Sequence, residues 1–367
     1  MDEKENVKEK FNISDRTWNI FQKILDQPSL HPDLKRKSRD ARLNDLIRWL
    51  KKYRYINSDY NELGMDIEGF CNEEEYLDHF RAHLDALKNF NFYYLAGSPV
   101  PRPINAVLSD DKYVFHNYIE SIHPGITPKI YMYIFCGGKT YNEFGEYEDV
   151  FSAMEKLPDG KYVCKPVLGQ CGRDIIVISV NGGQVVLGEN ITLSELKVNF
   201  EKEDYIVQEF LTQHESMAAL NKSSVNTVRI TTTRFNENAY LFTAMARIGI
   251  GDTLVDNAAA GGTCVGIDLE TGKLMKFGCY HDKPKETRHP ITGIEYEGFQ
   301  IPFWEESTQI VKHLHRFYKG FPSLGWDVAI TPEGPKIIEN NYDWAFGIMQ
   351  QIHGGLKKRW EQAKSLK

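Results

Sequence analysis

The stretch Gly325-Trp-Asp-Val-Ala-Ile-Thr-Pro-Glu-Gly-Pro-Lys-Ile-Ile-Glu-Asn-Asn341 contains two short apolar segments separated by a turn. Trp, Val and Ile favour strands, and Pro-Glu-Gly favours a reversal of the chain. The stretch therefore predicts a β-hairpin with strands over 326–330 and 335–339.

This hairpin brings together three oxygen-bearing side chains. Glu339 and Asn341 are two residues apart, so they project from the same face of the second strand, and Asp327 can join them from the first strand. Three oxygen donors at one point suit a hard cation such as Mg²⁺. A solvent-facing acidic hairpin is the alternative. The apolar neighbours of Asp327 and Glu339 favour pairing or metal binding instead.

A second informative stretch, Lys161 to Ser179, places Lys165 on a strand before a loop that contains Gly169 and Gly172. Glycines let backbone amides approach a phosphate closely, and a strand lysine supplies a cation for the same anion. A plain β-hairpin with a glycine turn explains the stretch equally well. The spacing matches neither GxxxxGK[ST] nor a GxGxxG turn before a helix.

Two further strands carry polar residues. Arg229 lies within the predicted strand 225–235, where a buried arginine needs either a carboxylate in the same sheet or a bound phosphate. The predicted strand 205–211 contains Gln208 and Glu209, and its end can offer backbone groups to a flat heterocycle. An ordinary strand end is the simpler interpretation of that segment.

The remaining periodicities predict a mixed α/β body behind a helical N-terminal region that covers about the first ninety residues. Further strands are expected over 129–135, 161–167, 174–180 and 240–248, and helices around 18–25, 43–50, 76–87 and 304–318, with another that begins at the capping box of Thr192 and Glu195. Basic residues between the first helices are expected to form a solvated face, with an acidic partner as the alternative.

Composition limits the class of protein. The formal net charge of −7 argues against a protein whose main function is nucleic-acid binding, and no apolar run is long enough to predict a membrane span. The charged first residues contain no signal peptide, and the six cysteines include no CxxC pair. A cytoplasmic protein with free thiols is expected.

Taken in order, these stretches resemble the ATP-grasp superfamily over roughly two thirds of the chain, from about 108 to 341. Val225-Asn-Thr-Val-Arg229 and Ile337-Ile-Glu-Asn-Asn341 look most like its sugar-transfer-associated group. The resemblance implies an α+β ATP-grasp fold in which two lobes clasp ATP. It divides the chain into a helical region (1–105), an N-lobe with the glycine loop (106–204) and a C-lobe with the metal site (205–367).

The resemblance also implies roles for individual residues. Phosphate-binding residues would be Lys112, Lys165, Gly169, Gln170 and Gly172; adenine-binding residues Gln208, Glu209 and Leu211; the ribose-binding residue Glu215 (or His214); and Mg²⁺ ligands Asp327, Glu339 and Asn341, usually for two ions. Arg229 and Lys165 would be catalytic, because they would stabilise charge on the transferred phosphoryl group.

The reaction that the resemblance implies is an ATP-dependent ligation of a small-molecule carboxylate to an amine through an acyl phosphate. A kinase that phosphorylates a hydroxyl and a non-catalytic nucleotide-binding module are the alternatives. The segment 256–262 is expected to face the acceptor, and the histidines of 279–300, His281 and His289, are expected at the surface. A homo-oligomer is compatible with the sequence.

Overall fold

The computed structural model describes most of the chain: residues 11–70, 72–77, 82, 87–88, 91–96, 101–142, 144–169, 172–188, 191–252, 261–280, 283–344 and 346–366. Some features predicted from the sequence lie outside these residues: Gln170, Phe80, Leu84, His281, Cys71, Cys171 and most of the acceptor-side segment, 256–260.

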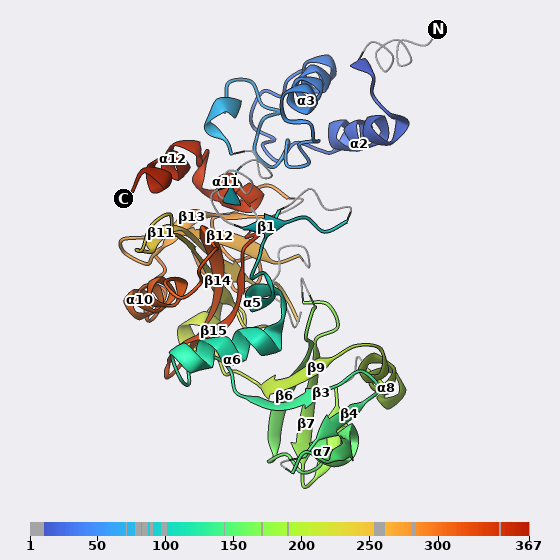
Figure 1. Ribbon diagram of the computed structural model, residues 1–367. Helices are drawn as coiled ribbons and strands as arrows, with labels where there is room; N and C mark the ends of the chain where they lie inside the picture. The colour runs from blue at the N-terminus through green and yellow to red at the C-terminus, as the bar shows by residue number, and fades with distance from the viewer. Residues whose placement is uncertain are drawn as a thin grey trace.

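The fold is α+β, and its two larger sheets are entirely antiparallel in the described part of the chain (Figure 1). The first sheet has the strand order β3 (Ile130–Ile134), β9 (Tyr205–Glu209), β6 (Gly160–Pro166), β7 (Ile176–Asn181) and β8 (Gln184–Leu187). Its core packs against α7 (Val150–Met154) and α8 (Leu193–Lys202). Thr192 and Glu195 form the predicted capping box at the start of α8.

The second sheet has the strand order β13 (Leu274–Cys279), β12 (Thr263–Ile267), β11 (Tyr240–Ile248), β10 (Thr227–Thr233), β14 (Ser323–Thr331) and β15 (Gly334–Asn341). Side chains alternate between its faces, so Val228 and Val328 enter the main core while Arg229 and Asp327 project from the opposite face. The core face is covered by α6 (Lys112–Ile122), α9 (Glu215–Leu220) and α10 (Trp304–His315).

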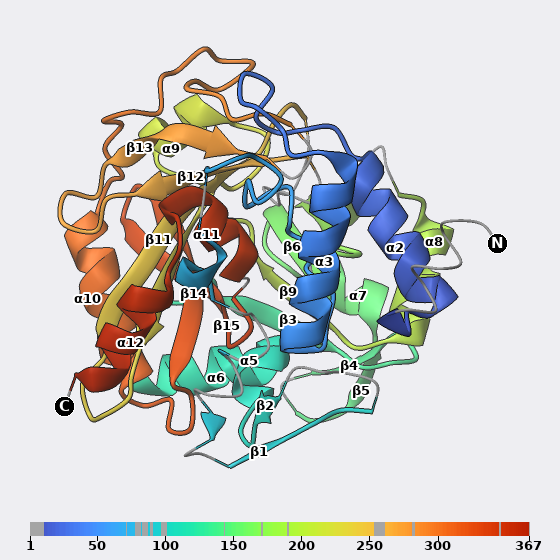
Figure 2. The same cartoon turned by 90° about the horizontal axis from the view of Figure 1, so that it is seen from above.

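The opposite face is partly covered by the C-terminal helices α11 (Phe346–His353) and α12 (Lys357–Ser365), which lie across this sheet when the molecule is seen from above (Figure 2). Trp344, Phe346 and Trp360 pack there against Phe242 of β11. Arg229 and Asp327 project from this same face.

The N-terminal unit has its own apolar core between α2 (Asp15–Asp26) and α3 (Arg39–Tyr53). Ser14 and Ser38 cap these helices. The unit docks beside α11 and α12, where Gln350 exchanges two hydrogen bonds with the backbone of Leu77, at 2.6 and 3.2 Å.

The remaining elements are short: η1 (Glu73–Glu75), β1 (Phe92–Tyr93), β2 (Arg102–Pro103), α5 (Val107–Asp110), β4 (Lys139–Tyr141) and β5 (Tyr147–Asp149). None of the described helices combines the length and hydropathy that crossing a bilayer requires. The described cysteines, Cys136, Cys164, Cys264 and Cys279, form no disulfide.

Several sequence-based expectations need correction. The segment 54–70 forms turns and a bridge between Arg36 and Ile67, so the N-terminal region is less helical than its periodicity suggests. The strand expected over 205–211 ends at Glu209, and the helix expected over 304–318 ends at His315. His289, expected at the surface, is only 1% exposed and is held by hydrogen bonds.

Candidate functional site

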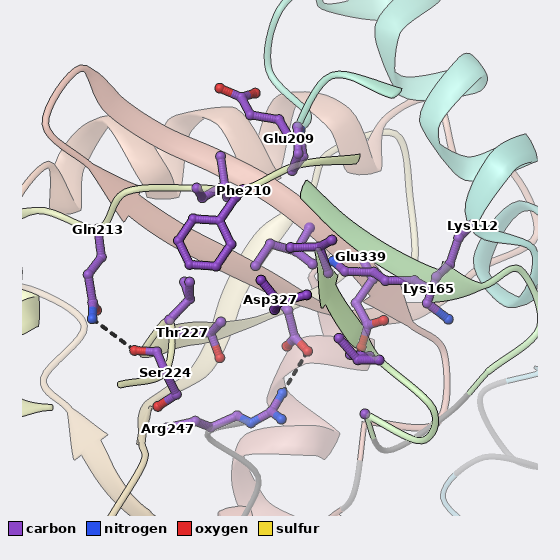
Figure 3. A pocket seen from close by; sticks show the side chains of 18 of the residues that line it. Lys112, Lys165, Glu209, Phe210, Gln213, Ser224, Thr227, Arg247, Asp327 and Glu339 are labelled. Carbon is purple, nitrogen blue, oxygen red and sulfur yellow. Dashed lines mark hydrogen bonds and ion pairs between the residues drawn. The ribbon is translucent and has the colours of Figure 1, made fainter. Parts of the chain in front are cut away.

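A cavity of about 350 Å³ lies between the two sheets, with walls from both (Figure 3). Its apolar lining includes Val163, Ile175, Val177, Phe210, Leu211 and Ile338. Its charged lining consists of Lys112, Lys165, Arg173, Glu209, Lys222, Arg247, Asp327 and Glu339. The described lining therefore carries five cations against three carboxylates, a local positive excess in a chain with a net charge of −7.

Strand register brings the central charged residues together. Arg229 on β10 lies directly opposite Asp327 on β14, which in turn lies opposite Glu339 on β15. Residues at paired positions share a face of the sheet, so the three side chains form a row across three strands. Asn341 lies one pleat further along β15, and its amide nitrogen is 3.5 Å from Oε1 of Glu339.

Asp327 is the most heavily engaged of these carboxylates. Arg229 donates to both of its oxygens through Nε and Nη2, and Arg247 donates to Oδ2 through Nη1, each at 2.7 Å. Burial favours the neutral acid, but the two guanidiniums outweigh it and hold the pKa of Asp327 below its usual range. Arg229 thus has the carboxylate partner that was one of its two alternatives, and it does not line the cavity.

The two predicted lysines reach the cavity from different elements. Asp111 caps α6, and the backbone N–H of Lys112 donates to the carbonyl of Val167 at 3.1 Å, which ties the start of α6 to the end of β6. The ammonium of Lys112 donates to the carbonyl of Gly169. Burial lowers the pKa of both lysines, to about 8 for Lys165, where the carboxylate of Glu339 opposes the shift and Lys112 reinforces it.

The glycine loop follows β6. Gly169 and Gly172 both line the cavity, and Gly172 has a φ of +71°, a backbone conformation that other residues rarely adopt. Gln170, between them, lies outside the described residues.

Only part of the segment predicted to bind adenine faces the cavity. Glu209 and Leu211 line the cavity, whereas Gln208 lies in the sheet, opposite Ile130 and Val163, and is 4% exposed. Glu215 is exposed and does not line the cavity, and His214 caps α9 by accepting from the backbone N–H of Ser216. The geometry therefore supports neither residue as the ribose ligand, and Thr212 and Ser223 line the cavity instead.

Comparison with known families identifies the fold. A model of the sugar-transfer-associated ATP-grasp family matches residues 99–365, most of the chain. The chain belongs to this ATP-grasp family. A search of curated proteins found no match.

Solved structures of other ATP-grasp proteins show distant similarity. An N5-carboxyaminoimidazole ribonucleotide synthetase in complex with ADP has 12% identity and a TM-score of 0.38, over 73% of this chain and 52% of that one. An L-amino acid ligase from Bacillus licheniformis has 11% identity and a TM-score of 0.36, over 67% of this chain and 43% of that one. D-Alanine-D-alanine ligase from Helicobacter pylori has 12% identity and a TM-score of 0.40, over 71% of this chain and 62% of that one. The chain spans less than two thirds of each of these structures.

Arg247 of this ATP-grasp protein was not among the site residues predicted from the sequence. It lies on β11, in the strand expected over 240–248, and it both lines the cavity and binds Asp327. The signal was present, because Arg247 is a charged residue within an apolar run, as Arg229 is. A charged residue buried in an apolar strand needs a polar partner, and this reasoning indicates both Arg229 and Arg247.

The donor set around Glu339 fits a hard cation in its chemistry. Glu339 and Asn341 present a carboxylate and an amide, and Asp327 has about four lone-pair positions, of which the arginines use three. No cluster of three His, Cys, Asp or Glu side chains suitable for a metal occurs among the described residues. Mg²⁺ typically takes few ligands from the protein, and water and phosphate oxygens complete its coordination shell.

Proposed function

We propose that this protein binds Mg-ATP in the cavity and is an ADP-forming ligase that joins a small-molecule carboxylate to an amine. The observation that carries the proposal is the convergence of Lys112, Lys165 and Arg247 with Glu339 around one cavity that also has apolar side chains in its walls. A flat base fits between apolar side chains of the two sheets, such as Val177 and Ile338, and the cations fit the phosphates.

In the proposed reaction, the γ-phosphoryl group passes from ATP to a carboxylate oxygen and ADP leaves. An amine then attacks the acyl carbon, phosphate leaves, and the amine gives up a proton. The chain supplies charge and position: Lys112, Lys165 and Arg247 offset the anionic phosphates, while Arg229 holds Asp327 in place. Magnesium, held by Glu339, Asn341 and Asp327, would neutralise phosphate charge when bound.

The finer parts of the proposal follow from the family. We propose lobes over 106–204 and 205–367 with the helical region 1–105 beside them. We further propose a cytoplasmic protein that modifies a sugar acid, amino acid or peptide in polysaccharide biosynthesis. The matched family's description as sugar-transfer-associated supports the link to polysaccharide biosynthesis.

Nucleotide binding and turnover test the proposal separately. Calorimetry should detect binding of AMP-PNP with Mg²⁺, and ADP release should require both a carboxylate and an amine, with a mass spectrum that shows the condensed product. Glu339→Gln should abolish turnover while the exposed control Glu201→Gln retains it. A phosphorylated hydroxyl product would replace the ligase by a kinase, and failure to bind AMP-PNP would overturn the whole proposal.

A further inference from the structure

We propose that Asn226 is a positioning residue that fixes the cavity wall and the strand of Arg247 relative to each other. It acts through a buried brace that consists of Gln213, Asn226, Gly249 and His289. The brace is observed in the structure; its value for nucleotide binding rests on the proposed function. Asn226 belongs to the Val225–Arg229 stretch singled out in the sequence, yet it touches no part of the cavity itself.

Every polar atom of the Asn226 side chain is used, and the residue is fully buried. Its Nδ2 lies 2.7 to 3.0 Å from three acceptors, which are the carbonyls of Met217 and Asn221 and Oε1 of Gln213. Its Oδ1 accepts from the backbone N–H of Gly249 at 3.1 Å. The reversed amide would place an oxygen against three acceptors, so the surroundings allow one orientation.

Gln213 completes the inner half of the brace. Its Nε2 donates to the carbonyls of Asn221 and Ser224, each at 2.8 Å, and its Oε1 accepts from both nitrogens of Asn226. Gln213 lines the cavity, and its bond to Ser224 is drawn in Figure 3. All the hydrogen-bonding positions of its amide are taken by protein groups. It therefore holds the wall in shape and has no free capacity for a ligand.

His289 anchors the outer half. The N–H of Thr292 can only donate, so Nδ1 of His289 accepts from it at 3.2 Å, and Nε2–H donates to the carbonyl of Gly249 at 3.0 Å. Gly249 is thus bonded on both sides, to Asn226 and to His289. A Cβ at Gly249 would lie 2.2 Å from Oγ of Ser224, so the close approach of these segments requires glycine.

The brace connects the segments that form one wall of the cavity. Asn226 bonds the segment after β9, the end of α9 and the end of β11, and these segments carry Thr212, Ser223 and Arg247 into the lining. Arg247 is two residues before Gly249. A shift of Gly249 would therefore move both Arg247 and the rim of the wall.

Asn226→Asp tests the brace with almost no change in volume. The new oxygen would face three acceptors, which is repulsive in a buried site, so we expect AMP-PNP affinity to fall by about tenfold or more. Hydrogen exchange should increase over 211–226 and 245–252. Partial recovery of affinity at lower pH is also expected, because protonation of the introduced carboxylate restores one donor; a merely looser fold would not recover.

The matched control is Asn221→Asp, because the backbone carbonyl of Asn221 accepts from the brace but its side chain bonds only to Ser223 and Ser224. Its Oδ1 would still accept from the N–H of Ser223, and the hydroxyl of Ser224 can turn to donate to the new oxygen. Affinity within about twofold of wild type is expected for this control. If Asn226→Asp also stays within that range, or leaves exchange over 211–226 unchanged, the proposal is overturned.

A second variant covers the case in which Asn226→Asp does not fold. His289→Ala removes only the outer anchor, and it should raise exchange over 249–252 and weaken AMP-PNP binding by about threefold. Unchanged exchange and affinity would overturn the proposal. If wild type binds no AMP-PNP, the proposed function fails, while the exchange data still decide whether the brace positions the wall.

Discussion

The guanidinium of Arg229 donates to both carboxylate oxygens of Asp327 at 2.7 Å, from the directly opposite position on the neighbouring strand. Arg247 adds a third hydrogen bond to the same carboxylate, so two guanidiniums share Asp327. Glu339, opposite Asp327 on the other side, supplies a second negative charge. With these four charges balanced, Lys112 and Lys165 give the site a positive excess, which suits a polyphosphate.

Asp327→Asn should destabilise the fold strongly. The side chains of Asp327 and Arg229 are 3% and 13% exposed, so removal of the carboxylate charge leaves two guanidiniums close together without their shared counter-ion. The expected loss in the free energy of unfolding is about 3 kcal/mol, measured by urea denaturation at pH 7. The exposed control Asp33→Asn should change it by less than about 0.5 kcal/mol. A similarly small effect of Asp327→Asn would contradict this account of the row.

The same pair predicts the direction of acid sensitivity. The pKa of Asp327 is lowered in the folded state, so its contribution to stability is fully present above the unfolded pKa of about 4 and is lost as the pH falls below it. The difference in stability between wild type and Asp327→Asn should therefore shrink steadily below about pH 4. A difference that stays constant down to the acid transition would show that the charge of Asp327 is not what stabilises the site.

Lys165 predicts proton uptake when nucleotide binds. Burial lowers its pKa to about 8, so near that pH about half of the molecules carry a neutral amine, and phosphate oxygens would favour the ammonium. Titration of AMP-PNP at pH 8 in two buffers of different ionisation enthalpy should show uptake of up to about half a proton. Affinity should fall as the pH rises above 8.

Variants separate this effect from other titrations. Lys165→Met should bind AMP-PNP more weakly and lose the proton uptake, because the titrating group is gone. Lys197→Met, on the exposed face of α8 and outside the cavity lining, should retain both. Uptake that persists in Lys165→Met would assign the proton to a different residue.

The hairpin of β14 and β15 shows which residue pairings the local sequence predicts and which it does not. Alternation within 325–341 placed Asp327 and Glu339 on neighbouring strands, and the structure pairs them directly. The partnership of Asp327 with Arg229 joins residues that are 98 positions apart, and no local pattern contains that register. From the sequence, the partner of Arg229 could be either a carboxylate or a bound phosphate. The order of strands in the sheet decides between them, because it places Asp327 beside Arg229.

Polar side chains inside the wall were the least predictable part. Gln213 follows the predicted strand 205–211 and Asn226 lies near the start of the predicted strand 225–235. Their roles depend on carbonyls at α9 and on the N–H of Gly249 after β11, which no local pattern places beside them. Glu215 illustrates the opposite case, because family spacing placed it near the ribose but α9 turns it to solvent. Spacing along the chain predicts which residues are near a site, whereas the direction of a side chain depends on the local fold.

Asn341 should tune magnesium dependence. Its amide lies beside Glu339, so Asn341→Ala removes one of the three proposed oxygen donors without removing a charge. The Mg²⁺ concentration for half-maximal AMP-PNP binding should rise by about tenfold or more, while binding at saturating Mg²⁺ is largely restored. An unchanged Mg²⁺ midpoint would remove Asn341 from the ligand set.

Gly325 should tolerate no side chain, because Trp344 packs directly against it. A Cβ at this position would lie 2.5 Å from Cβ of Trp344 and 3.6 Å from Cδ of Arg229. Trp344 is fully buried and donates to Oγ of Ser323 at 3.0 Å, so it cannot move aside without loss of that bond. Gly325→Ala is therefore expected to reduce the free energy of unfolding by about 1–3 kcal/mol through the clash with Trp344. Gly188→Ala, whose added Cβ would come no closer than 4.0 Å to a described atom, is the matched control. If both variants unfold at the same urea concentration, the contact between Gly325 and Trp344 does not constrain the site.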